Sequence, residues 1–179
     1  RGVRGVVLDL AGKDSKKLNA MRVLEQHGVA YATFTFSPEI HSAVGVAEAV
    51  GLPPETVFKT LVVLRPDGQP LLAVIPGPAT LDLKALAAAV GVKKLSMAPQ
   101  AEAERLTGLK VGGISPLALL HKCWPVVLDA SAEAHAAILI SAGQRGVNLR
   151  VPVAGLKQVL APQIAAVARW DEQEPPGDR

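Results

Sequence analysis

The amino-acid sequence predicts a single α/β domain, in which a mixed β-sheet is surrounded by helices. A chain of 179 residues fits one domain and can bury a core without disulfide bonds. Apolar residues make up 49% of the chain but aromatic residues only 3%, so we expect an aliphatic core. Candidate strands and helices interleave without strict alternation, which favours a mixed sheet over a regular doubly wound parallel fold.

Most elements are bounded by residues that start or stop regular structure, such as Ser15 before the first helix and Gly28 after it. The clearest signal is a hairpin, in which two apolar runs flank the turn Arg65-Pro66-Asp67-Gly68 at the expected centre of the sheet. In chain order we expect a helix between Ser15 and Gly28, a strand at 29–36, a helix at 42–50, strands at 60–64 and 71–75, helices at 81–90 and 99–106, strands at 126–128, 137–140 and 147–151, and helices at 153–160 and 163–170.

The domain is expected to span residues 15–170. Residues 1–14 are interpreted as a loosely ordered extension, and residues 171–179 as a flexible tail containing Pro-Pro-Gly. Apolar runs are far shorter than the ~20 residues of a membrane-spanning helix, so we expect no membrane span. The single cysteine, Cys123, excludes an internal disulfide and fits a reducing compartment, which indicates a cytoplasmic protein.

Several chemistries find no support in the sequence. The four histidines are scattered without the paired spacing of metal ligands, and neither a Walker loop nor a dinucleotide-binding glycine motif is present. A formal net charge of +3 would help a polyanion approach without identifying it. General binding of nucleic acids by base stacking is disfavoured, because the chain has one Tyr, three Phe and two Trp.

Three short segments carry residue types that suit a substrate site. In the first, residues 57–64, Lys59 stands at the start of an expected strand. Its ammonium could hold a phosphate or stabilise charge on a carbonyl oxygen, or it could simply reach water along its apolar stem. In the second, residues 111–116, Gly112 and Gly113 could direct backbone N–H groups at an oxyanion, or form an ordinary tight turn.

The third segment, residues 141–146, is a small polar loop that follows an apolar strand. Arg145 could hold a phosphate through its fork of donors, and Ser141 could orient a polar group of the substrate. The alternative interpretation is a glycine-rich turn with a solvated arginine.

Taken in order, these segments resemble the YbaK/ProX family of trans-editing proteins, whose relatives include the editing domain inserted in bacterial prolyl-tRNA synthetases. The resemblance covers about residues 18–167 of this chain. Its motifs here are VFKTLVV at 57–63, LDLKALAAAVG at 81–91, LTGLKVGGISP at 106–116 and SAGQRGVNL at 141–149.

The resemblance implies a mixed β-sheet with surrounding helices and hydrolysis of the ester bond of mischarged aminoacyl-tRNA. The expected substrate is of the Cys-tRNA(Pro) type or carries a related small amino acid, and no metal or organic cofactor is implied. The expected partners are the acceptor end of a mischarged tRNA and prolyl-tRNA synthetase, with the protein a monomer or weak homodimer.

Matched residue by residue, Lys59 corresponds to the family's essential lysine, with Thr60 beside it in the pocket. Gly112 and Gly113 correspond to the loop whose backbone faces the substrate carbonyl, and Ser141 to a pocket serine. These matches make Lys59, Gly112 and Gly113 the expected catalytic residues.

Three positions depart from the cysteine-specific branch of the family. Phe36 stands where that branch often has tyrosine, Asn148 where it commonly has aspartate, and Ala118 where a glycine is usual. The remaining residues expected to bind substrate are Ile114, Ser115, Gly143 and Arg145.

The resemblance also implies that the attack needs no nucleophile from the protein, because help comes from a substrate thiol or from a tRNA ribose hydroxyl that orients water. Cys123 is interpreted as a core residue. The main alternative is a binding module without catalysis that recognises an aminoacyl-tRNA end or an amino acid.

Overall fold

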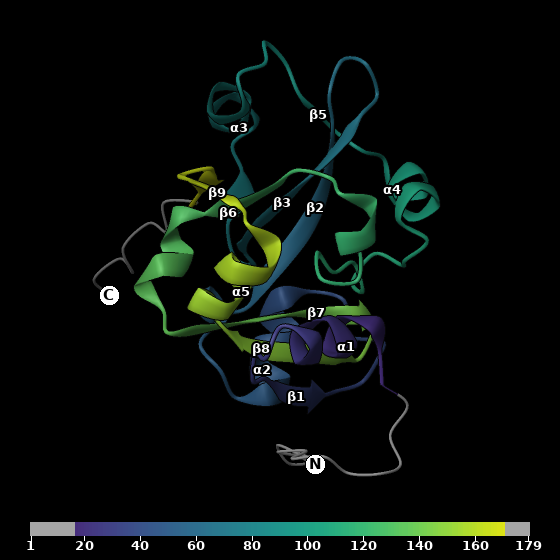
Figure 1. Cartoon of the computed structure of the whole chain (residues 1–179), viewed down its shortest axis with the longest axis vertical. Helices are drawn as coiled ribbons and strands as arrows, with labels where there is room; N and C mark the ends of the chain where they lie inside the picture. Colours follow the sequence, from purple (N-terminus) through teal and green to yellow (C-terminus); the bar gives the residue numbers. More distant parts are fainter. Residues whose placement is uncertain (1–16, 171–179) are drawn as a thin grey trace, which may run out of the picture.

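The computed structural model describes residues 17–170 (Figure 1). The expected Ser15 cap and the two terminal segments, 1–14 and 171–179, lie outside these residues. The elements are α1 (Asn19–Gln26), β1 (Ala32–Thr35), α2 (Ala43–Val50), η1 (Pro54–Thr56), β2 (Phe58–Leu64), β3 (Pro70–Pro76), β4 (Thr80–Leu81), α3 (Leu83–Val90), β5 (Ser96–Met97), α4 (Gln100–Thr107), η2 (Leu120–Lys122), β6 (Val126–Asp129), η3 (Ala130–Ala134), β7 (Ala137–Gln144), β8 (Val147–Pro152), α5 (Val153–Leu160), β9 (Gln163–Ala165) and β10 (Ala168–Arg169).

A five-stranded mixed sheet forms the larger half of the fold, in the order β5-β2-β3-β6-β9. The pairs β2–β3 and β2–β5 are antiparallel, whereas β3–β6 and β6–β9 are parallel. Every residue of β3 is buried, as expected for a central strand with neighbours on both edges and both faces covered. The hairpin predicted from the sequence therefore does lie at the centre of a sheet.

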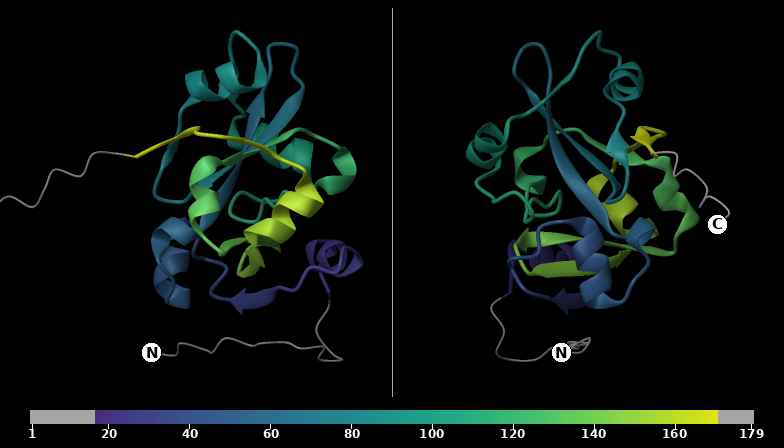
Figure 2. Two further views of the ribbon diagram at one scale, coloured as in Figure 1. Left: turned by 60° about the vertical axis from the view of Figure 1, so that its left-hand side comes forward. Right: turned by 180° about the vertical axis from the view of Figure 1, so that it is seen from behind.

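A smaller antiparallel sheet, in the order β1-β8-β7, lies beside the end of the β2–β3 hairpin that is remote from its turn. Figures 1 and 2 show it below the hairpin in every view. Val57, the residue before β2, forms an isolated parallel bridge with Leu139 of β7, so the two sheets meet just before the strand that carries Lys59.

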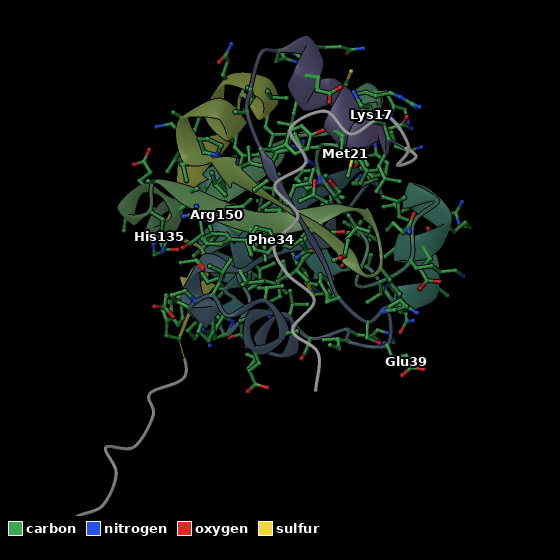
Figure 3. The ribbon with its side chains drawn as sticks, turned by 90° about the horizontal axis from the view of Figure 1, so that it is seen from below. Lys17, Met21, Phe34, Glu39, His135 and Arg150 are labelled. Atoms are coloured by element: carbon green, nitrogen blue, oxygen red, sulfur yellow. The ribbon has the colours of Figure 1, made fainter. Side chains whose placement is uncertain are left out.

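Helices cover both faces of each sheet. Buried residues of α1 and α5, such as Leu24 and Leu156, pack on one face of the smaller sheet with Ile138 and Leu149. Helix α2 covers the opposite face, around Phe34 of β1. Viewed from below in Figure 3, Phe34 lies near the middle of this sheet, Lys17 and Met21 lie toward one side, and Glu39 lies at the periphery.

The larger sheet is covered in the same way. Helix α3 packs Leu86 against Val63 and Ile75 on one face. Helix α4 and the loop that follows it pack Ala103 and Ile114 against the other face. The core is aliphatic, as the composition predicts.

The helix expected at 163–170 is wrong, because the chain forms the short strands β9 and β10 there. Strand β9 pairs in parallel with β6, and β10 pairs with β4. The N–H groups of Val167 and Ala168, which a helix would direct to its own carbonyls, both donate to the buried Asp129 carboxylate at 2.8 Å. Long-range pairing with strands distant in sequence thus overrides a local apolar pattern that suits a helix.

Each described α-helix is eight residues long. Within residues 17–170, therefore, no helix has the length and apolar character needed to cross a membrane.

Candidate active site

A cavity of about 410 Å³ lies where the two sheets meet. Its walls come from β2, from the ends of β7 and β8, from the first turn of α2, and from the segments around β5 and residues 111–114. The lining residues are His41, Ser42, Ala43, Val44, Val46, Val57, Phe58, Lys59, Thr60, Leu61, Val62, Gly77, Met97, Ala98, Gln100, Ala103, Val111, Gly112, Ile114, Ser141 and Asn148.

Lys59 is the half-buried cation of this cavity. It is the second residue of β2 and pairs with Ile75 of β3, so a rigid central hairpin sets its backbone position. Its Nζ donates a hydrogen bond to the Gly77 carbonyl at 3.0 Å, which holds the ammonium at the cavity wall. Burial lowers the pKa of Lys59, because the charged form loses hydration there.

Gly77, in the Pro76-Gly77-Pro78 turn after β3, fixes both the lysine and the start of α2. Its N–H donates to the Val57 carbonyl at 2.7 Å while its own carbonyl accepts from Lys59. A Cβ at this position would lie 2.1 Å from the Ala43 Cβ and 2.9 Å from the Val57 oxygen, so any side chain here would push α2 away. Only glycine allows this close approach.

The N-terminus of α2 contributes to the same wall through residues 41–44. Ser42 caps the helix by accepting from the Gly45 N–H at 3.0 Å. The N–H groups of Ala43 and Val44 have no hydrogen-bond partner within residues 17–170. Unpaired N–H groups at a helix start carry partial positive charge, so this wall adds to the positive potential of Lys59.

The two adjacent glycines have different surroundings. Gly112 lines the cavity with φ +90°, and its N–H has no hydrogen-bond partner in the described part of the chain. Gly113 is not among the lining residues, and its N–H donates to the Lys110 carbonyl at 2.8 Å. Of the two N–H groups expected to face an oxyanion, only that of Gly112 is therefore available.

Ser141 and Asn148 face each other across the β7–β8 pair and form the polar wall of the cavity. The Ser141 hydroxyl accepts from the Gly143 N–H at 3.2 Å. Asn148 is only 5% exposed, yet its carboxamide has no hydrogen-bond partner among residues 17–170. A carboxamide that is unpaired within the protein and reaches the surface of a cavity is suited to binding a polar ligand group.

The other residues expected from the sequence divide into two groups. Thr60 and Ile114 line the cavity with Lys59. Four others lie outside the lining. Ser115 is fully buried, with its hydroxyl accepting from the Ala118 N–H, and the Arg145 Nε donates to the Val111 carbonyl. Gly143 lies at the bulge in β7, and Phe36 packs in the cluster around Phe34.

The expectation that Cys123 is a core residue is wrong. It is exposed, with φ +54°, in the turn before β6, and it is not among the residues that line the cavity. Because Cys123 lies outside the cavity lining, its thiol is not placed to act as a nucleophile there.

Sequence reasoning missed several of the lining residues. His41, Gly77 and Met97 carried no motif, although the Pro-Gly-Pro string around Gly77 marks a tight turn after a strand. Of the described side chains that line the cavity, only His41 and Lys59 are ionisable, so no carboxylate or thiol faces it. Val44 and Met97 are 42% and 41% exposed and give the cavity an apolar rim.

Comparison with known proteins connects this cavity to an established family. The sequence pattern of the aminoacyl-tRNA editing domain matches residues 37–159, which include the whole of β2, the diglycine loop and both residues of the polar wall. A protein from Enterococcus faecalis, described as a candidate Cys-tRNA(Pro)/Cys-tRNA(Cys) deacylase named EbsC, is 40% identical over 157 residues, covering 87% of this chain and 95% of its own.

Proline–tRNA ligases contain a similar segment. The ligase of Trichlorobacter lovleyi is 31% identical over 112 residues, which cover 63% of this chain. The chain spans only 19% of the length of that ligase, so the similarity concerns one part of a larger protein.

Solved structures share the fold. A crystal structure described as a candidate trans-editing enzyme for prolyl-tRNA synthetase superposes with a TM-score of 0.73 at 25% identity, covering 87% of this chain and 99% of its own. A hypothetical protein of known structure gives a TM-score of 0.78 at 22% identity, covering 84% of this chain and 99% of its own.

Proposed function

The chain belongs to the aminoacyl-tRNA editing domain family, and we propose that it is a deacylase that hydrolyses the ester between a wrongly attached amino acid and tRNA. The observation that carries this proposal is one cavity that joins the Lys59 ammonium, the unpaired Gly112 N–H and a neutral polar wall. Its volume of about 410 Å³ is within the range of about 300–1,000 Å³ typical of small-ligand sites.

We propose that the positive wall holds the 3′ end of the tRNA. Lys59 and the N-terminus of α2 lie on the same side of the cavity and both favour negative charge. The ester is already an activated acyl group, so catalysis chiefly requires that its carbonyl be held beside a donor that binds the developing oxyanion. The Gly112 N–H is the donor that we assign to this oxyanion.

The attacking group comes from the substrate side in this proposal. No carboxylate or thiol is among the described residues lining the cavity, which agrees with attack by a substrate thiol or by water oriented by a ribose hydroxyl. Among the described lining residues, the alternative proton acceptor is His41, which is exposed on the rim. If the substrate itself supplies the nucleophile or orients the water, His41→Ala should leave the rate within about threefold of the wild type.

The polar wall formed by Ser141 and Asn148 indicates which amino acid the cavity prefers. Asn148 offers both donors and an acceptor, and Ser141 lies opposite it, so a small amino acid with a polar or thiol side chain suits this wall better than a large apolar one. We therefore propose Cys-tRNA(Pro) or a tRNA carrying a related small amino acid as the substrate. EbsC, which is described as a candidate deacylase of Cys-tRNA(Pro) and Cys-tRNA(Cys), supports this choice.

Partner and location follow from the same proposal. Proline–tRNA ligases contain a segment similar to this chain, so prolyl-tRNA synthetase is the proposed enzyme that supplies the mischarged tRNA. A protein that acts on aminoacyl-tRNA works where translation occurs, so we propose the cytoplasm.

The decisive experiment is a deacylation panel. Cysteinyl, alanyl, seryl and threonyl esters on proline tRNA and on their cognate tRNAs are incubated with the purified protein, and the loss of labelled aminoacyl-tRNA is followed. We expect hydrolysis of at least one small aminoacyl ester on proline tRNA. Binding of these tRNAs without hydrolysis of any ester would instead identify a non-catalytic binding module.

A further inference from the structure

The peptide groups around Val111 are held from two sides by charged side chains. The Val111 N–H donates to Glu104 Oε1 of α4 at 3.2 Å. The Val111 carbonyl accepts from Arg145 Nε, in the β7–β8 turn, at 2.7 Å. Glu104 and Arg145, which are 41 residues apart in the sequence, thus both hold Val111.

The Val111 carbonyl and the Gly112 N–H belong to the same planar peptide unit. In a trans peptide the C=O and N–H bonds point in opposite directions, so fixing one fixes the other. The hydrogen bond from Arg145 therefore sets the direction of the Gly112 N–H, which is the available donor of the diglycine loop. A cation on the carbonyl also polarises the peptide and strengthens its N–H as a donor.

Packing of the loop against the β7–β8 turn supports the same contact. A Cβ on Gly113 would lie 3.0 Å from the Arg145 backbone nitrogen and 3.1 Å from the Gln144 carbonyl carbon, so the two backbones touch. Gly112 has φ +90°, a conformation that glycine adopts without strain but that needs neighbouring contacts to select it. The hydrogen bonds on Val111 provide such contacts.

Glu104 is committed to this loop in the same way. The Val111 N–H is the main cause of the lowered pKa of Glu104, and Gln100 and Lys110 also lie within reach of its carboxylate. Glu102, two residues earlier on the same helix, instead forms an ion pair with Arg105.

We propose that Arg145 and Glu104 are positioning residues that hold the Gly112 N–H in the direction required to bind the oxyanion. This inference rests on the proposed deacylase function. It gives Arg145 a role in organising the loop in place of the phosphate contact that the sequence suggested.

Single-turnover and steady-state kinetics on the best ester of the panel test this proposal. Arg145→Met and Glu104→Ala should each lower kcat by roughly 10- to 100-fold with little change in KM, because a misdirected donor weakens transition-state binding alone. Glu104→Gln keeps an acceptor for the Val111 N–H and should retain most of kcat. Glu102→Ala, which breaks an ion pair on the same helix, is the matched control and should leave both constants unchanged.

The combination Arg145→Met with Glu104→Ala should lose little more than the worse single variant, because both side chains hold the same residue. A rise in KM for Arg145→Met at unchanged kcat would overturn the proposal and favour a phosphate ligand. Additive losses would overturn it as well. Should Arg145→Met fail to fold, Arg145→Lys carries the same test, since it keeps the charge but moves the donor one bond further from the backbone.

A second measurement does not depend on activity. Amide hydrogen exchange by NMR should show a protected Val111 N–H in the wild type and in Glu104→Gln, and at least about tenfold faster exchange in Glu104→Ala, while the core amides of β3 stay protected. Unchanged protection of the Val111 N–H in Glu104→Ala would overturn the positioning role of Glu104 even if the protein is an active deacylase. If the wild type shows this exchange pattern but hydrolyses no ester, the proposed function is wrong, whereas the hydrogen bonding of Val111 by Glu104 is supported.

Discussion

The two sheets differ in how firmly they hold the residues they bring to the cavity. The five-stranded sheet places Lys59 on β2, which pairs along its full length with the buried strand β3. The three-stranded sheet places Ser141 and Asn148 beside a bulge between Ser141 and Gln144, where the regular pairing of β7 and β8 is interrupted. One wall is rigid and charged, whereas the other is neutral and lies next to an irregularity.

This difference matches the two tasks that editing requires. Every aminoacyl-tRNA presents the same ester and the same 3′ end, so the groups that hold these parts benefit from a rigid central strand. Amino-acid side chains vary, so the groups that discriminate among them can lie on a wall that tolerates substitution. We therefore expect changes at Lys59 on the larger sheet to alter the rate, and changes at Ser141 and Asn148 on the smaller sheet to alter the choice of amino acid.

The largest effect is expected for Lys59→Ala. Removing the ammonium should lower kcat/KM by roughly 10³-fold for every ester in the panel, because the positive charge acts on parts that all substrates share. Thermal unfolding should shift little, since the side chain is only half-buried. Lys84→Ala, an exposed lysine on α3, is the matched control and should keep full activity.

Gly112→Ala should lower kcat by about 100-fold, since a Cβ disfavours φ +90° and the N–H would turn away from the cavity. The added methyl has room, because the nearest heavy atom is 3.6 Å away, so the effect isolates backbone conformation. Gly108→Ala is matched in strain, with φ +70° and open space, but ends α4 outside the cavity lining. Equal activity of the two variants would remove the Gly112 N–H from the mechanism.

The pH dependence of the rate should report Lys59. Because burial lowers the pKa of this group, the active ammonium form is lost as pH rises, at a pH below the ordinary lysine value of 10.5. Above that pKa, we expect the enzymatic rate, corrected for alkaline hydrolysis of the ester, to fall by about tenfold per pH unit. The unfolded chain binds more protons than the folded one between the two pKa values, so the free energy of unfolding should rise slightly with pH there.

The smallest change in overall rate, but a change in selectivity, is expected for Asn148→Leu. Loss of the carboxamide removes hydrogen bonds to the amino-acid side chain, so the kcat/KM ratio of polar to alanyl esters should fall by about tenfold, equivalent to roughly 1.4 kcal/mol. Activity on the alanyl ester should persist. Asn19→Leu, at an exposed position of α1, serves as the control, and a uniform loss on all esters would contradict the division between the two sheets.

Much of this arrangement was predictable from the sequence, because strong local signals mark it. The turn residues of the β2–β3 hairpin and the helix expected at 42–50 correspond closely to the elements observed. The order of the four motifs identified the family, and through it Lys59, Gly112 and Asn148, which the structure brings to one cavity.

The remainder depends on contacts between distant segments. Met97 reaches the cavity because the two-residue strand β5 pairs with the end of β2, a register that no local pattern encodes. The misassigned segment at 163–170 is fixed by pairing with β6 and β4 and by the Asp129 carboxylate. Gly77 likewise shows its importance only when α2 packs against it.

The scarcity of ionisable groups in the cavity limits what the proposed enzyme can attack. Without a carboxylate or thiol among the described lining residues, it has little means of cleaving a stable amide, whose poor leaving group demands stronger acid or nucleophilic assistance. The peptide bonds of finished proteins would then be inert toward it. The lability of the ester would thus separate aminoacyl-tRNA from proteins as substrates, and the polar wall would be left to separate one aminoacyl ester from another.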